Sequence, residues 1–283
     1  MKVTSRAFVK EQLPKIEADF HKYDRGRLLL VCGAYGMAGA CIMAARAALR
    51  TGCGFIDLAI PASIYPMVTQ AVPEAVCTVY DETDASSMEE ALKKAVDKAD
   101  AVAVGSGLGA LRDTVCPIVL KLCDEPLLID ADGLNYLSSC KEITLNSPDL
   151  VLTPHEGEAA RLFHTEASNI RQARQESAEV LAKVFHASVL LKGLSTVVAR
   201  EGEESFVNST GNAGLARAGS GDVLTGIIGS LMAQGMKGFY AAACGAFLHG
   251  LAGDRGCEKI GLRSLLPTDV IELIPEVLQE LEK

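Results

Sequence analysis

The stretch that decides the fold of this 283-residue chain is Asn208-Ser-Thr-Gly-Asn-Ala-Gly-Leu-Ala-Arg-Ala-Gly-Ser-Gly-Asp222-Val-Leu-Thr-Gly226. Its glycines allow backbone conformations and close approaches that a side chain would block. The apolar run at residues 223–232 predicts a helix that is buried nearly all round and ends at Gly235. Gly219-Ser-Gly-Asp222 therefore lies at the N-terminus of a buried helix, where unpaired N–H groups and the helix dipole favour an anion.

Asp222, in the first turn of that helix, is the candidate reactive carboxylate. An acid at this position is also a common helix cap, which is the alternative interpretation. A cap needs neither glycines on both sides nor a Gly/Asn-rich loop just ahead, so the functional interpretation is favoured. The segment is not a P-loop, because no Gly-Lys-Ser/Thr follows the glycines, and Gly105-Ser-Gly-Leu-Gly109 does not complete a dinucleotide fingerprint.

Working outward from this stretch, short β-branched or leucine-rich runs alternate with longer helical patterns. The expected strands are residues 27–32, 55–60, 101–105, 127–130, 150–153 and 188–192, followed by a hairpin at 196–200 and 205–207. The expected helices are residues 38–51, 88–98, 113–123, 155–163, 170–185, 222–234, 240–255 and 267–281. This alternation predicts one α/β domain over residues 1–283, with a mostly parallel sheet covered on both faces and an antiparallel hairpin at its edge.

Glycine-rich or polar residues follow five of the expected strands. They are residues 33–39, 105–109, 130–132, 153–156 and 192–193. A single such segment is an ordinary turn between strand and helix, but the carboxyl ends of parallel strands meet at one edge of the sheet, where ligands bind. The five segments together therefore predict a site at that edge.

Composition excludes several classes of protein. A net charge of -9 leaves no basic face to neutralise nucleic-acid phosphates. The nine cysteines are odd in number, form no C-x-x-C pair and fall mostly in apolar runs, which indicates free thiols in a reducing cytosol. No leader-like h-region and no apolar stretch of about 18 residues occurs, so we expect a cytoplasmic protein with no membrane partner.

The Gly-Ser-Gly-Asp sequence before a buried helix resembles the ribokinase-like superfamily. Within it, Asn208-Ser-Thr-Gly-Asn-Ala-Gly-Leu-Ala216 is similar to the ADP/ATP-dependent NAD(P)H-hydrate dehydratases more than to sugar or vitamin kinases. Further matches are Gly36-Met-Ala-Gly-Ala40, Ala44-Ala-Arg-Ala-Ala-Leu-Arg50, Gly105-Ser-Gly-Leu-Gly109, Asp130-Ala-Asp-Gly-Leu-Asn135, Thr153-Pro-His-Glu-Gly-Glu158 and Leu191-Lys-Gly193. The resemblance runs from about residue 6 to the C-terminus. It departs at Ala218, where many relatives have Gly, and a negative φ would make the methyl group tolerable.

The resemblance implies a three-layer α/β/α ribokinase-like fold and a role for each matching residue. Asp222 would be the catalytic base and would also contact the substrate. The other substrate-binding residues implied are Ala40, Gly107 and His155. The implied nucleotide-binding residues are Lys192, Gly193, Leu194, Ser195, Thr196 and Gly221, and the implied anion hole is Gly219, Ser220 and Gly221. The loop at residues 208–216, with His155 and Ala40, would narrow the acceptor to a hydrated nicotinamide dinucleotide.

The implied activity is repair of (6S)-NADHX and (6S)-NADPHX to NADH and NADPH. ADP, or alternatively ATP, would phosphorylate the C6 hydroxyl, and phosphate would then be eliminated. Mg²⁺ is expected to travel with the nucleotide and to have no direct protein ligand, although Glu156 and Glu158 could reach it through water or could simply be first-turn acids. We expect a homotetramer and a separate epimerase, because the chain is too short for an added epimerase domain.

Two rival functions stay open at this point. A kinase of the same superfamily, acting on a vitamin precursor such as hydroxyethylthiazole, would share residues 219–222 but should lack the 208–216 pattern. A nucleotide sensor on the same fold would bind without turnover. His155 as a helix cap and Lys192 as a surface lysine are the corresponding alternatives for single residues.

Overall fold

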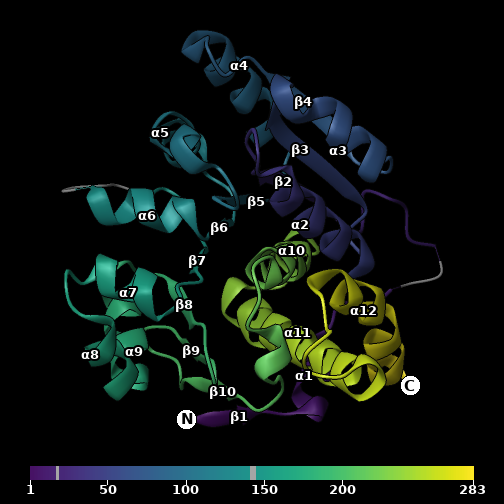
Figure 1. Cartoon of the computed structure of the whole chain (residues 1–283), viewed down its shortest axis with the longest axis vertical. Coiled ribbons are helices and arrows are strands. Elements are labelled where there is room, and N and C mark those ends of the chain that lie inside the picture. Colours follow the sequence, from purple (N-terminus) through teal and green to yellow (C-terminus); the bar gives the residue numbers. More distant parts are fainter. Residues whose placement is uncertain (17–18, 141–144) are drawn as a thin grey trace.

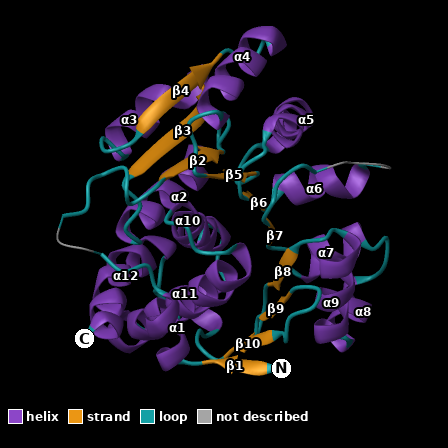
Figure 2. Ribbon diagram, turned by 180° about the vertical axis from the view of Figure 1, so that it is seen from behind, coloured by secondary structure: helices purple, strands orange, loops and turns teal. Residues whose placement is uncertain are grey.

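The structure is a computed structural model that describes residues 1–16, 19–140 and 145–283. Its strands form a ten-stranded sheet in the order β1-β10-β9-β8-β7-β6-β5-β2-β3-β4, which runs through the middle of the molecule between two sets of helices (Figure 1). All neighbouring strands are parallel except β9, which is antiparallel to both β8 and β10 (Figure 2). The mostly parallel sheet with an antiparallel hairpin is thus confirmed.

The elements alternate along the chain. The strands are β1 (Lys2–Thr4), β2 (Arg27–Val31), β3 (Phe55–Pro61), β4 (Val76–Tyr80), β5 (Ala101–Val104), β6 (Leu127–Ile129), β7 (Leu150–Leu152), β8 (Ser188–Leu191), β9 (Val197–Ala199) and β10 (Phe206–Asn208). The α-helices are α1 (Arg6–Gln12), α2 (Ala38–Arg50), α3 (Tyr65–Ala71), α4 (Ala85–Val96), α5 (Arg112–Leu122), α6 (Asp132–Ser139), α7 (Glu156–Leu162), α8 (Ala167–Gln172), α9 (Arg174–Val184), α10 (Ser220–Ala233), α11 (Gly238–Ile260) and α12 (Pro267–Glu282).

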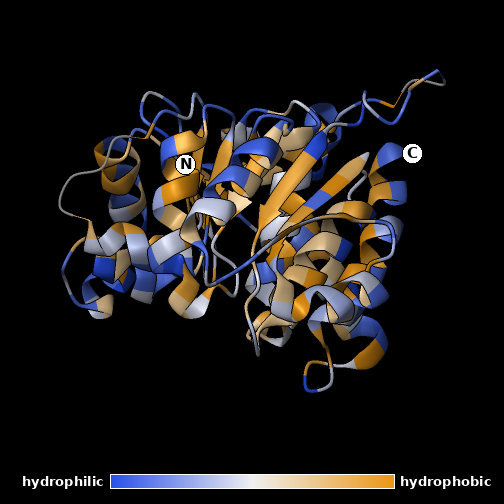
Figure 3. Ribbon diagram, turned by 90° about the horizontal axis from the view of Figure 1, so that it is seen from above, coloured by the Kyte–Doolittle hydropathy of each residue, from blue (hydrophilic) through white to orange (hydrophobic). Residues whose placement is uncertain are grey.

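Two separate apolar clusters lie on the two faces of the sheet, because successive side chains of a strand point in opposite directions. In β2, Leu28 and Leu30 belong to the cluster formed with α2, α10, α11 and α12. Leu29 and Val31 belong to the cluster formed with α4, α5, α7 and α9. The strands are accordingly apolar along their length while the covering helices are mixed (Figure 3). This arrangement confirms the three-layer α/β/α fold.

The structure adds elements that the sequence pattern did not predict. These are β1, β4, α1, α3, α6 and three short 3₁₀ turns. Strand β1 pairs with β10, so the predicted hairpin lies one strand inside the edge of the sheet. The predicted helix at residues 170–185 is two helices, α8 and α9, because Ala173 between them has φ -130° and ψ 49°, which is not helical. Helix α11 is longer than predicted at both ends.

Helix α10 is packed unusually closely into its layer. A Cβ on Gly226 would lie 2.1 Å from the carbonyl oxygen of Ala44 in α2, and a Cβ on Gly229 would lie 3.0 Å from the Leu28 side chain in β2. The backbone of α10 therefore rests directly on α2, with no side chain as a spacer. This contact fixes the N-terminus of α10 at the carboxyl edge of the sheet.

Candidate functional site

The direction in which the chain adds strands to the sheet reverses between β2 and β5. From β2 the chain continues outward through β3 and β4, and from β5 it continues in the opposite direction through β6 and β7. Loops that leave two adjacent strands on opposite faces open a crevice at their carboxyl ends, and this is where ligands bind in such sheets. The predicted edge of the sheet is therefore also its topological switch point.

The loops at this edge are joined by backbone contacts. The N–H of Gly33 donates to the carbonyl of Ser106 at 2.8 Å, and the N–H of Asp130 donates to the carbonyl of Val104 at 3.1 Å. A Cβ on Gly105 would lie 1.9 Å from the carbonyl oxygen of Asp130, so only glycine fits there. The expectation that the loops after β2, β5 and β6 converge is confirmed.

The start of α7 and the end of β8 form the next part of the edge. Lys192 donates its backbone N–H to the carbonyl of Pro154 at 2.8 Å, which places Lys192 beside His155. The Nδ1 atom of His155 accepts from the N–H groups of Gly157 at 2.9 Å and Glu158 at 3.2 Å. His155 is thus the N-cap of α7, which was the alternative interpretation of this residue.

Capping also determines what His155 can offer a ligand. Since Nδ1 accepts two hydrogen bonds, the proton of the neutral ring is on Nε2. Partial burial, followed by the charges of Lys192 and Arg161, lowers the pKa of His155 and keeps it neutral at physiological pH. About half of the side chain is exposed, at 54 %. The residue therefore caps the helix, and its Nε2–H lies at the edge of the site, 3.4 Å from Oε1 of Glu158.

The N-terminus of α10 has free backbone donors. Gly219, the residue before the helix, has φ 97°, and a Cβ on it would lie 2.7 Å from Met43, so both conformation and space require glycine. The N–H of Ser220 donates to the carbonyl of Arg217, whereas the N–H groups of Gly221 and Asp222 have no acceptor among the residues described. Of the predicted trio, Ser220 is engaged, whereas the N–H groups of Gly219 and Gly221 have no acceptor among the residues described, and Asp222 adds a further free donor.

The φ angle of Ala218 is not positive, so the backbone at this position accepts the methyl group, as the sequence analysis required. The departure from the family pattern at this position therefore leaves the geometry of the turn intact.

Asp222 is a carboxyl group poised to exchange a proton near neutral pH. Burial raises its pKa to about 6, and the negative charge of Asp130 adds to the rise, while Ser106 and Lys192 oppose it. Ser106 is 2 % exposed, and its hydroxyl has no hydrogen-bond partner in the described part of the chain, so it is free to donate to a group at the site. A general base works best when its pKa is close to the working pH, so the environment of Asp222 suits proton abstraction.

Lys192 is held inside a buried group of charges. Its Nζ lies 2.6 Å from Oδ1 of Asp130 and 3.7 Å from Oε2 of Glu158. Burial opposes the charge on Lys192, but Asp130 and Glu158 outweigh it and raise the lysine pKa. For Glu158, burial is the largest cause and raises the carboxyl pKa. Lys192 is thus a charged residue of the site, and the interpretation as a surface lysine is wrong.

A cavity of about 450 Å³ opens beside Gly221. The predicted nucleotide-binding residues share its wall: Lys192, Gly193, Leu194, Ser195, Thr196 and Gly221 all line it, together with Ser220 of the predicted anion hole. Residues 210–213, 215 and 216 of the loop after β10 and one face of α11 also line it. The structure thus brings the predicted nucleotide residues together around one hollow.

The predicted substrate residues Ala40 and Gly107 meet elsewhere, outside the lining of this cavity. A Cβ on Gly107 would lie 2.7 Å from the Cβ of Ala40, so α2 and the loop after β5 touch at this point. The loop at residues 208–216, which was expected to narrow the acceptor, lies on the cavity side, with Lys192 to Thr196, and not beside Ala40. The structure therefore associates this loop with the predicted nucleotide residues.

Two polar residues of α11 belong to the site and were not predicted. Asp254 accepts hydrogen bonds from the N–H of Gly211 at 2.9 Å and from the Asn212 amide at 2.7 Å, which ties the loop to the helix. His249 lines the cavity and is 8 % exposed. Burial, with a smaller effect of Lys192, lowers its pKa to about 4, so the ring is neutral. Both are polar residues on a helix otherwise rich in Ala and Gly, and this contrast was the available signal.

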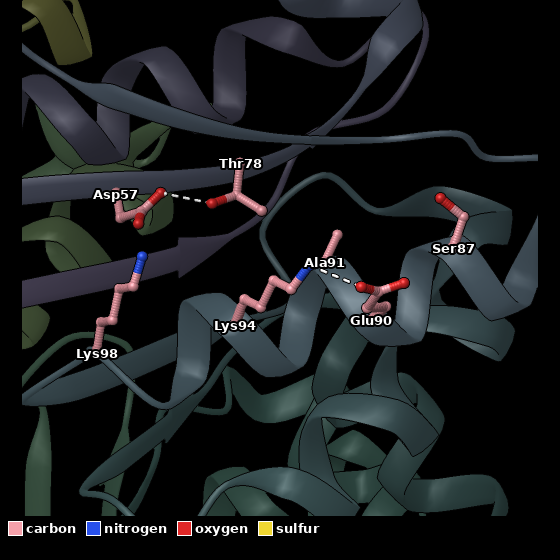
Figure 4. A pocket seen from close by; sticks show the side chains of 7 residues that line it. All are labelled: Asp57, Thr78, Ser87, Glu90, Ala91, Lys94 and Lys98. Carbon is pink, nitrogen blue, oxygen red and sulfur yellow. Dashed lines mark hydrogen bonds and ion pairs between the residues drawn. The ribbon is translucent and has the colours of Figure 1, made fainter.

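A second cavity, of about 360 Å³, lies between β3, β4 and α4 (Figure 4). Three of its charged groups have partners: Lys94 pairs with Glu90 at 2.7 Å, and Asp57 accepts from the Thr78 hydroxyl at 3.0 Å. None of its lining residues comes from the converging loops. We therefore place the candidate site at the N-terminus of α10.

Two further observations concern the described residues as a set. No three or more His, Cys, Asp and Glu side chains among them converge as a metal site would require. No helix in the described ranges combines the length and the apolar character that a membrane span needs.

Comparisons with known proteins agree with this geometry. A model of the NAD(P)H-hydrate dehydratase family matches residues 28–276. The ADP-dependent (S)-NAD(P)H-hydrate dehydratase of Neisseria meningitidis is 41 % identical over 251 residues, covering 86 % of this chain and 81 % of that protein. The bifunctional NAD(P)H-hydrate repair enzyme Nnr of Moorella thermoacetica is 39 % identical over 289 residues, and this chain spans about half of it, 54 %.

A solved structure gives the same answer for the fold. The ADP/ATP-dependent NAD(P)H-hydrate dehydratase of Bacillus subtilis, co-crystallized with ATP and Mg²⁺, superimposes with a TM-score of 0.87 at 27 % identity and covers 99 % of both chains. The family match spans most of the chain, and the relatives above 30 % identity cover it almost completely. The chain therefore belongs to the NAD(P)H-hydrate dehydratase family.

Proposed function

We propose that this chain dehydrates (6S)-NADHX and (6S)-NADPHX to NADH and NADPH by phosphorylating the C6 hydroxyl and eliminating phosphate. The observation that carries the proposal is Asp222, a carboxyl group whose pKa is about 6, set among free N–H groups at the N-terminus of α10 and beside the cavity of Lys192 and Gly221. The names of the relatives support the choice of substrate.

The chemistry needs little more than this arrangement. Hydroxide is a poor leaving group and phosphate a good one, so phosphorylation makes elimination possible. The lone pair of the ring nitrogen then expels the phosphate, which leaves an iminium ion, and loss of a proton from C5 to solvent restores the double bond. The protein has to align donor and hydroxyl, accept the hydroxyl proton and stabilise charge on the phosphoryl oxygens.

Each part of the site has one of these tasks. The Asp222 carboxylate accepts the proton of the C6 hydroxyl as its oxygen attacks the terminal phosphorus, a contribution of roughly 10²–10⁴-fold. The free N–H groups of α10 and the Lys192 ammonium stabilise the phosphoryl group in transit. The neighbouring cavity holds the nucleotide, with Lys192 to Thr196 on one wall. Ala40, Gly107 and the Nε2–H of His155 contact the hydrated cofactor.

Mg²⁺ fits this site as a companion of the nucleotide. Glu156 is engaged by Arg171 at 2.9 Å and Arg174 at 2.7 Å, so its carboxylate is not available to an ion. Glu158 is a buried carboxylate that accepts from the N–H of His155 at 2.8 Å and lies 3.7 Å from Lys192, so it would approach the ion only through water. The ion would neutralise phosphate charge. We propose ADP as the donor, in keeping with the ADP-dependent relatives.

The direct experiment is incubation of the protein with (6S)-NADHX, Mg²⁺ and either ADP or ATP. We expect NADH absorbance and free phosphate to rise in equal amounts. A stable phosphoester without NADH would identify a small-molecule kinase instead, and tight binding of both ligands without turnover would identify a sensor. The cytoplasmic location, the homotetramer and the separate epimerase stay predictions.

A further inference from the structure

Asp130, at the end of β6, is held by two elements at once. It is 2 % exposed, and its Oδ1 lies 2.6 Å from the Nζ of Lys192 at the end of β8. Its other oxygen, Oδ2, accepts from the hydroxyl of Thr225 in α10 at 2.8 Å. Because both oxygens are engaged, the carboxylate is held in one orientation. Its contact with Thr225 fixes that orientation relative to α10, the helix that carries Asp222.

The ion pair lies directly beside the free donors of α10. A Cβ built on Gly221 would be 3.7 Å from the Nζ of Lys192 and 3.8 Å from Oδ2 of Asp130. Lys192 has a flexible stem and a second carboxylate within reach, since Glu158 lies 3.7 Å from the same Nζ. The Asp130 contact is more than 1 Å shorter, so Asp130 decides which way the ammonium points.

We propose that Asp130 is a positioning residue that fixes the ammonium of Lys192 at the N-terminus of α10, where it meets the phosphoryl group in transit. This inference rests on the proposed function, because it assigns the two residues to the transfer step. A stabilising ion pair is the simpler alternative. However, a buried pair gives little net stability, because desolvation offsets the attraction of the charges, whereas holding a charge beside a substrate is a use that burial favours.

Asp130 also influences the base. Its negative charge raises the pKa of Asp222, and the charge of Lys192 lowers it. The other groups facing Asp222 are Asp132, the Ser106 hydroxyl and the Cys32 thiol. Removing the charge of Asp130 should therefore move the acid limb of the kcat/KM profile to lower pH. Removing the charge of Lys192 should move it to higher pH. These shifts follow from the two charges themselves, so a purely structural ion pair is told apart by kcat, which it would leave unchanged.

The test is a double-mutant cycle with Asp130→Asn, Lys192→Met and the double variant. Each single change should lower kcat roughly 10–100-fold, as expected for loss of one charge-assisted contact, with little change in the KM of (6S)-NADHX. If Asp130 acts through Lys192, the double variant is no slower than the slower single variant. Losses that multiply in the double variant, or wild-type kcat in Asp130→Asn, would overturn the proposal.

Thr225→Val is a second variant that keeps both charges and nearly the same volume. It should lower kcat in the same direction but less, because Asp130 retains its contact with Lys192; wild-type kcat together with an unmoved acid limb would count against the proposal. Asp149→Asn is the matched control: Asp149 pairs with Arg200 at 2.7 Å, away from the site. It should lose stability and keep wild-type kcat.

The proposed function and the positioning role of Asp130 can fail separately. If the wild-type protein does not produce NADH, the proposed function falls, and the same cycle is then read from the binding of ADP and ATP with Mg²⁺ by calorimetry. Equal, non-multiplying losses of affinity in Asp130→Asn and Lys192→Met would still support positioning. Multiplying losses, or wild-type affinity in Asp130→Asn, would refute it.

Discussion

Replacing Asp222 by Asn should abolish turnover and, at the same time, stabilise the protein. Burial raises the pKa of this carboxyl group from 3.8 to about 6, so the folded protein holds an unfavourable charge at neutral pH. That difference corresponds to about 3 kcal/mol. Since the residue is partly exposed and solvent screens part of the effect, we expect the Asn variant to gain about 1–3 kcal/mol.

The gain should depend on pH in a defined way. Below about pH 4 the carboxyl group is protonated in both the folded and the unfolded protein, and the two proteins should then be equally stable. The difference should grow between about pH 4 and about pH 6 and stay constant above it. Wild-type kcat/KM should fall on the acid side of the same value, because the base must be ionised to act.

Urea unfolding at about pH 8 and about pH 4 measures the stability term, and NADH formation measures turnover. Nucleotide affinity should change little, because the cavity wall is untouched. Asp124→Asn, an exposed acid without a hydrogen-bond partner among the described residues, is the control and should change neither property. Activity within a few-fold of wild type would remove Asp222 from the mechanism, and equal stability at about pH 8 would refute the assigned environment.

Three further changes separate the parts of the site. Gly107→Ala places a methyl group 2.7 Å from the Cβ of Ala40 at φ 65°, so it should cost about 1–2 kcal/mol and raise the KM of the hydrated cofactor, leaving ADP affinity unchanged in calorimetry. His155→Asn keeps a good helix cap and removes the ring, so the free energy of unfolding should change by only a few tenths of a kcal/mol while the substrate KM rises. Asp254→Asn should weaken nucleotide binding about 10-fold with little effect on substrate KM, and Glu258→Gln on the same helix should not.

Controls for these changes are available in the chain. Gly202→Ala has φ 81° but nothing within 4 Å of the new methyl group, so it isolates backbone strain from the clash. His155→Ala should lose about 1 kcal/mol that the Asn variant keeps, because alanine cannot cap α7. An unchanged substrate KM in Gly107→Ala, or an Asn variant at position 155 with wild-type kinetics, would separate these residues from the substrate.

The sequence predicted the elements whose patterns are local. The strands leading into residues 33, 105 and 130 are short apolar runs, and α10 is apolar almost throughout, so both were recognisable. Strand β1 was missed because it is three residues long, Lys2–Thr4, and it exists through pairing with β10 more than 200 residues away. Strand β4 was missed because it lies at the other edge, where it is only partly buried and lacks a clear alternation.

The same limit applied to the site. Asp222 and its glycines form one continuous motif, so local reasoning reached them. The partners of Lys192 and of the loop after β10 come from distant elements: Asp130 lies 62 residues from Lys192, and Asp254 lies 43 residues from Gly211. Which polar residue faces which is decided by packing of the sheet and of α11, and no spacing in the sequence records it.

The direct backbone contact of Gly226 with Ala44 determines which parts of the site are rigid and which can be redesigned. Because α10 and α2 touch through their backbones, the base and the residues near Ala40 move as one body, and the amide hydrogens of α10 should be among the slowest to exchange. The loop after β10, in contrast, is tied to α11 by the side chain of Asp254. On the proposed function, preference for the phosphoryl donor could therefore be redesigned in that loop while the chemistry at Asp222 is inherited intact.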